Sequence, residues 1–254
     1  MRHTRLVGSR GGETEMGAIG KSASGEAGLW LRWVVANAVG EGIGLGGAVL
    51  IGAAGARRFG EDTGLFSAVI LAALAVLAGT LIEGTVVGTA QWLVLKGPLP
   101  TMRWGMWALA TGAGAFLAWT LDMIPSNLLS LGSGGAPSAE PAEATVLGLA
   151  FLMGLVLGPV LGLAQWLALH RFIRHAALWM PANALAWAFG MVTIFAGMDL
   201  ALGDGFGPGT VPKLGLTLLW CGAPVGAIHG LALVWLLRPA RRLDPENASW
   251  WPKS

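Results

Sequence analysis

Six apolar stretches, each about as long as a bilayer core is thick, constrain the fold of this chain more than any other feature. A hydrocarbon core of about 30 Å is crossed by about 20 residues of α-helix. The stretches occupy residues 29–56, 65–95, 104–125, 145–170, 177–198 and 212–237. They predict an all-α bundle of six transmembrane helices over residues 29–238.

The composition excludes several other classes of protein. Only 12% of the residues are charged, about half of what soluble domains carry. The Lys and Arg residues lie at the ends of the apolar stretches and form no basic face, so no nucleic-acid partner is expected. The single cysteine, Cys221, excludes an internal disulfide and a thiolate metal cluster. We therefore expect the lipid bilayer as the main partner, with no cofactor and no metal site, and the sequence leaves partner proteins open.

The two ends of the chain are predicted to be cytoplasmic tails. Residues 1–28 are polar and Gly-rich and lack the apolar core of a signal peptide, which predicts a disordered tail, and residues 239–254 form a second tail. Apart from Arg57, Arg58 and Lys213, every Lys and Arg lies on the side of these tails. Because cytoplasmic loops are enriched in Lys and Arg, both termini are expected inside.

Tryptophan and basic residues also gather on the predicted cytoplasmic side. The basic turn over residues 170–175 is expected to lie among headgroups and attract anionic lipid. Eight tryptophans near the same ends of the apolar stretches predict an interfacial aromatic belt. They are Trp30, Trp33, Trp92, Trp104, Trp107, Trp166, Trp179 and Trp235.

One pattern of glycine and glutamine recurs along the chain. "GTAQWLVL" at 88–95 and "GLAQWLAL" at 162–169 end the longer pattern G-x-x-x-G-x-x-Q. Its three copies are Gly84, Gly88 and Gln91, then Gly158, Gly162 and Gln165, then Gly222, Gly226 and His229, where imidazole replaces the amide. Small residues four apart let helices approach closely in lipid. The recurrence predicts three helical hairpins, about 29–95, 104–170 and 177–237, related by pseudo-threefold symmetry.

These segments resemble those of uncharacterised multi-pass bacterial membrane proteins that repeat a GxxQWxxL segment. The resemblance covers most of residues 30–237, including "WVVANAVG" and "WMPANALAWAFG", and it departs in the third copy, where "GAIHGLAL" has neither Gln nor Trp. It implies a bacterial inner membrane as the location. It implies no activity.

Six polar side chains are predicted to lie at one level near the cytoplasmic end of the bundle. Three come from the first helix of each hairpin and three from the second: Asn37, Thr111 and Asn183, and Gln91, Gln165 and His229. They could form a ring that holds a ligand, or bond in pairs across each hairpin and set its register. For His229 the alternatives are an axial ligand of a haem or chlorin metal and a hydrogen-bonded structural residue.

Two glutamates near mid-membrane have no counterpart in the other hairpins. In the other two hairpins, Ala115 and Trp187 stand at the position of Glu41. Leu157 and Cys221 stand at the position of Glu83. A carboxylate that faces lipid costs at least about 2.5 kcal/mol, so both are expected to face the interior. They could form a proton or cation site, or a pair that is protonated or bonded to neighbouring groups.

The sequence contains no catalytic motif such as GxSxG or HExxH, so we expect no enzyme. The favoured function is an accessory or ligand- or lipid-binding role in the membrane. The alternative is a small solute or proton-coupled transporter that uses Glu41 and Glu83. A single water-reachable cavity containing both acids would favour transport, and a sealed packed core would favour the accessory role.

Overall fold

The computed structural model describes residues 10–59, 65–132, 141–202, 207 and 209–238. Within these ranges the side chains are described from residue 24 onward, except those of residues 56, 59, 65, 68, 124–132 and 202. Its elements are all helical, which confirms the predicted class. They are α1 (Arg10–Phe59), α2 (Leu65–Ala78), the π-helical turn η1 (Gly79–Glu83), α3 (Gly84–Leu95), α4 (Trp104–Gly132), α5 (Glu143–Leu169), the 3-10 turn η2 (Ala176–Leu178), α6 (Trp179–Leu202) and α7 (Thr210–Leu236). Because α2, η1 and α3 follow one another without a break, the described residues form six helical segments.

Five of these segments are long and apolar enough to cross a membrane, which is the basis for describing the chain as a polytopic membrane protein. They are Ser24–Gly55, Val69–Leu95, Glu143–Leu169, Ala176–Ala201 and Thr210–Leu236. The expected span at 104–125 is not among them, because the Trp, Gly and Thr residues of α4 lower its mean hydropathy. α4 nevertheless packs beside α3 and α5 and exposes apolar side chains such as Leu109 and Leu121.

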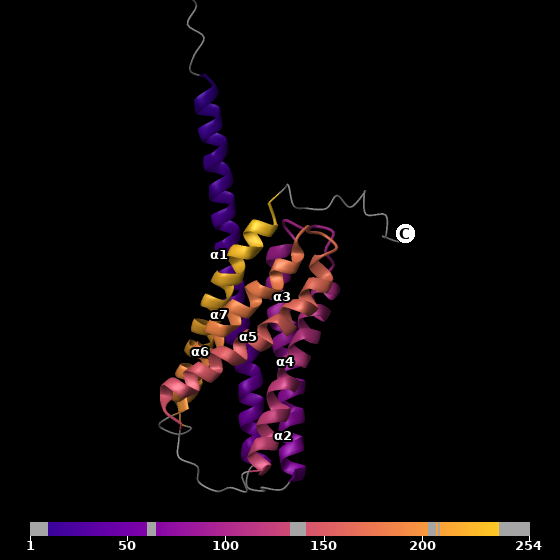
Figure 1. The fold of residues 1–254 in the computed structure, drawn as a ribbon, viewed down its shortest axis with the longest axis vertical. Helices are drawn as coiled ribbons and strands as arrows, with labels where there is room; N and C mark the ends of the chain where they lie inside the picture. Colours follow the sequence, from indigo (N-terminus) through magenta and orange to yellow (C-terminus); the bar gives the residue numbers. More distant parts are fainter. Residues whose placement is uncertain (1–9, 60–64, 133–140, 203–206, 208, 239–254) are drawn as a thin grey trace, which may run out of the picture.

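The helix boundaries agree with the predicted stretches to within about four residues, except at the start of α1 and at the end of α4, which continues to Gly132 instead of ending near residue 125. Helix α1 begins at Arg10, inside the segment 1–28 for which a disordered tail was expected, and it projects beyond the bundle (Figure 1). Extending an existing helix fixes one residue for each new hydrogen bond and avoids the cost of nucleation. Residues 1–9 and 239–254, the remainder of the predicted tails, lie outside the described residues.

The six segments contact one another in the order α1, α3, α4, α5, α6 and α7, and α7 contacts α1, so the helices enclose a common interior. The connections 96–103 and 170–178 lie at one end, which we call the tryptophan end because Trp33, Trp107 and Trp179 lie near it. At the opposite, far end, α5, α6 and α7 diverge from α1, α2 and α4 (Figure 1).

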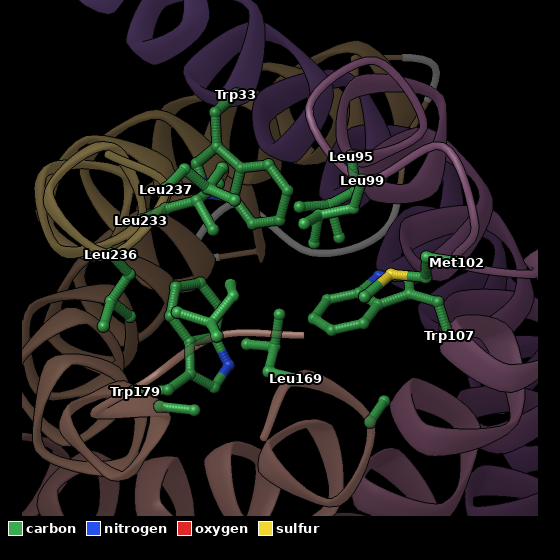
Figure 2. Close-up of a cluster of buried hydrophobic side chains, with 13 residues drawn as sticks. Trp33, Leu95, Leu99, Met102, Trp107, Leu169, Trp179, Leu233, Leu236 and Leu237 are labelled. Carbon is green, nitrogen blue, oxygen red and sulfur yellow. The ribbon is translucent and has the colours of Figure 1, made fainter. Parts of the chain in front are cut away.

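An apolar plug closes the interior at the tryptophan end (Figure 2). Its side chains come from the last turns of α3, α5 and α7 and from the connections between helices. They include Leu95, Leu99, Met102, Leu169, Ile173, Leu233, Leu236 and Leu237, all of them buried. The plug fills the bundle axis at this end with side chains that exclude water.

Candidate functional site

A hydrogen-bonded polar network lies directly below the plug, and Gln91 of α3 is at its centre. Gln91 Nε2 donates to Asn37 Oδ1 of α1 at 2.8 Å, and Gln91 Oε1 accepts from Trp107 Nε1 of α4 at 3.1 Å. The side chain is buried, as is each partner. One amide therefore links three helices, and it does so inside a hydrocarbon environment where an unpaired amide is costly.

Gln165 of α5 repeats these bonds on the next helices. Its Nε2 donates to Thr111 Oγ1 of α4 at 3.1 Å and to Gln91 Oε1 at 3.2 Å, and its Oε1 accepts from Trp179 Nε1 of α6 at 2.8 Å. Both glutamines thus bond to a polar residue across their own hairpin, Gln91 to Asn37 and Gln165 to Thr111.

His229 of α7 takes the third position with one difference. Its Nδ1 accepts from Trp33 Nε1 of α1 at 2.8 Å, which joins the last helix to the first. The imidazole also packs against two indoles that contact each other, with ring centroids 5.7 Å from Trp33 and 5.2 Å from Trp179. The described contacts are those of a hydrogen-bonded residue packed against aromatic rings. Asn183, its expected partner, donates instead to Trp179 O at 2.9 Å.

Three tryptophans that were expected in an interfacial belt belong to this network, so that prediction is wrong for them. Trp33, Trp107 and Trp179 are completely buried, and each donates its indole N–H to a polar side chain on a neighbouring helix. Sequence reasoning missed them because an indole suits both a buried polar contact and a membrane interface. Trp104, in contrast, is about half exposed.

Glycines bring the helix backbones close enough for these side chains to reach one another. A Cβ on Gly88 would lie 3.2 Å from Ala108 Cα, and one on Gly162 would lie 3.0 Å from Met180 Cα. Gly226 faces Val34 Cα at the same 3.0 Å. One turn further from the tryptophan end, Gly84, Gly158 and Gly222 face the backbones of Gly112, Asn183 and Asn37. At all six positions a larger side chain would separate two helices.

Glu41 and Glu83 both face the interior, as expected, and are 1% and 7% exposed. Glu83 is the last residue of the π-helical turn η1, whose extra residue rotates the side chains that follow it. Its Oε2 accepts from Trp119 Nε1 of α4 at 2.7 Å. Glu41 Oε2 is buried and has no hydrogen-bond partner among the described residues. A polar atom in that condition is rare in folded proteins and marks a candidate site.

A small cavity of about 10 Å³ adjoins these two acids, which is room for about one water molecule. All eight polar candidates from the sequence line it: Asn37, Glu41, Glu83, Gln91, Thr111, Gln165, Asn183 and His229. The structure thus brings together residues from all six helical segments. The apolar plug separates this cavity from the tryptophan end of the bundle.

A second, larger cavity of about 180 Å³ begins at Glu83 and extends toward the far end. Glu83, Ala115, Leu161 and Trp187 line both cavities, so the two are adjacent. The larger cavity is mainly apolar, and both diverging groups of helices contribute to its wall. Sequence reasoning did not identify its lining, which includes Trp119, Asp122, Met153, Met191, Phe195 and Met198.

Among the described side chains, no group of three or more His, Cys, Asp and Glu residues is close enough together to hold a metal ion.

Comparisons with protein-family models, curated proteins and solved structures gave no match for this chain. The resemblance to multi-pass proteins with repeated GxxQWxxL segments therefore stays a prediction.

Proposed function

We propose that this chain is a non-enzymatic, ligand-binding membrane protein whose ligand occupies the apolar cavity at Glu83. The observation that carries the proposal is the cavity itself: about 180 Å³ of mainly apolar space that ends at a buried carboxyl group. Binding pockets for small molecules typically combine an apolar lining with a few polar groups that orient the ligand. The polar network is already bonded internally, so its role in this proposal is to hold the helices around the cavity.

The proposal includes a threefold architecture in which all six segments cross the membrane as three hairpins. Three bonds support it, each from an indole in the first helix of one hairpin to the Gln or His in the second helix of a neighbouring hairpin. Glycine contacts at equivalent places in each hairpin support it as well. Helix α4 is the sixth span, because it packs between two apolar helices and presents apolar side chains outward.

The proposed location is a bacterial inner membrane with both termini in the cytoplasm. Arg171 and Arg174 are exposed in the connection at the tryptophan end, where they would lie against anionic headgroups. An Arg174→Cys variant, labelled with a membrane-impermeant thiol reagent in inverted vesicles, tests this orientation, because the cytoplasmic face of such vesicles points outward. Labelling only from the outside of inverted vesicles agrees with it, and labelling only from the lumen contradicts it.

Native mass spectrometry on protein purified gently from its expression membranes tests ligand binding. Ala118 lines the cavity, whereas Ala113 on the same helix is exposed on the outside of the bundle. We expect a discrete bound mass on the wild type, its loss in Ala118→Phe and its retention in Ala113→Phe. A wild-type protein without a bound mass, or equal occupancy of both variants, would contradict the proposal.

A proton-coupled transporter is the second candidate, and the position of Glu83 between the two cavities favours it. A carboxyl group that borders both an enclosed polar space and a wider cavity could exchange a proton for a solute. Proteoliposomes that contain a pH-sensitive dye test this candidate. If the protein is a transporter, adding the substrate should change the internal pH with the wild type and not with Glu83→Gln. A wild type that binds its ligand and moves no protons would leave binding as the function.

A further inference from the structure

The polar end of the large cavity is rich in hydrogen-bond acceptors. The four side-chain amides of the network and the indoles of Trp33, Trp107 and Trp179 already donate to other groups, and none of them donates to Glu41 Oε2. Glu83 Oε2 receives one bond from Trp119. A ligand that brings its own N–H or O–H donors would therefore satisfy a buried oxygen that the protein leaves without a partner.

The charges around the two cavities favour a cation. The acidic side chains Glu41, Glu83 and Asp122 line them, and no Lys or Arg does so among the described residues. The one imidazole in the lining, His229, accepts a hydrogen bond through Nδ1 and so is not doubly protonated in this arrangement. A buried carboxyl group is stable as the neutral acid or as a carboxylate beside a positive charge. An ammonium ligand supplies that positive charge, whereas an anionic ligand does not.

The apolar wall sets the size and character of the rest of the ligand. Trp119, Trp187 and Phe195 line the cavity, and aromatic faces attract ammonium groups. The volume of about 180 Å³ slightly exceeds the roughly 150 Å³ of a cavity known to bind benzene. One aromatic ring with a short side chain fits this space.

Building on the proposed ligand-binding function, we propose that the ligand is a small hydrophobic ammonium ion, an arylalkyl or short alkyl amine. Its apolar body occupies the large cavity. Its ammonium group bonds to Glu83 and enters the adjoining small cavity, where Glu41 Oε2 accepts a second N–H. The pair of glutamates that breaks the pattern of the three hairpins thus becomes the specificity determinant of the cavity.

Three probes with the same aromatic body separate this proposal from simple apolar binding. They are 2-phenylethylamine, 2-phenylethanol and phenylacetate, each titrated calorimetrically into the full chain in lipid nanodiscs at pH 7. We expect the amine to bind at least tenfold more tightly than the alcohol, and phenylacetate not to bind. Glu83→Gln should weaken the amine at least tenfold and leave the alcohol unchanged, while Glu143→Gln, at the exposed start of α5, should match the wild type.

Each alternative outcome is decisive. Equal binding of amine and alcohol, unaffected by Glu83→Gln, would overturn the ammonium assignment and leave the cavity as a general apolar site. Failure of all three probes to bind, together with no bound mass on the wild type, would overturn the proposed function as well. If Glu83→Gln does not fold, Glu41→Gln replaces it, and amine binding within threefold of the wild type would then contradict the proposal.

Discussion

The tryptophan end and the middle of the bundle treat polar side chains in opposite ways. Asn37 and Glu41 lie one turn apart on α1, and both are fully buried. Both line the small cavity, but Asn37 is bonded to Trp33 O and Gln91 Nε2, whereas Glu41 Oε2 has no hydrogen-bond partner among the described residues. The difference indicates that the network stabilises the closed end of the bundle, and that the acids below it are available for binding.

The packing around the closed end gives the largest expected effect. Gly158 of α5 lies against the backbone of Asn183 and Ala184 in α6, so Gly158→Ala must push two helices apart. We expect a loss of about 3 kcal/mol, because overpacking at a backbone contact cannot be relieved by a rotamer change. The measurement is the yield of monodisperse protein in detergent and its apparent melting temperature. Gly148→Ala is the control, since nothing lies within 4 Å of that position; equal losses in both variants would contradict the prediction.

Loss of the central amide gives the next effect. Gln91→Leu removes the partners of Asn37, Trp107 and Gln165 together. Interhelical bonds average about 0.6 kcal/mol each, and buried groups left unpaired add to this, so we expect a destabilisation of about 2 kcal/mol. Thermal unfolding of the detergent-solubilised protein measures it.

The matched control for that amide is Thr193→Val, whose hydroxyl bonds only to Phe189 O of its own helix. We expect a change of less than about 0.5 kcal/mol for this control. A Gln91→Leu protein as stable as the control would show that the network contributes nothing to the closed end.

The smallest expected effect has the opposite sign and is the sharpest test of the comparison. Glu41→Gln keeps the shape of the side chain and replaces the unpartnered acid with a neutral amide. We expect a stabilisation of about 1 kcal/mol, which corresponds to an apparent Tm higher by about 2–4 °C for a chain of this size. A substitution that stabilises the fold and weakens ligand binding is the usual result at a residue that serves binding. A fall in Tm would place Glu41 with the structural network.

Much of the fold could be predicted because the bilayer imposes a length and a polarity on each crossing segment. The apolar stretches located all six helical segments, and the stretch 65–95 matches α2, η1 and α3 at both ends. The spacing of polar residues also placed Asn37, Thr111, Gln91 and Gln165 at one level, where two of the expected pairs are bonded. These features depend on distance along a helix, which a sequence specifies directly.

The partners of the buried side chains depended on which face of each helix points into the bundle, and only the tertiary structure decided that. In lipid the buried and exposed faces of a helix are both apolar, so a pattern of hydrophobic residues does not distinguish them. The burial of Trp33, Trp107 and Trp179 and the choice of Trp119 as the partner of Glu83 were invisible for this reason. The π-helical turn that ends at Glu83 and the divergence of the helices at the far end (Figure 1) are properties of packing between helices and have no signature in the sequence itself.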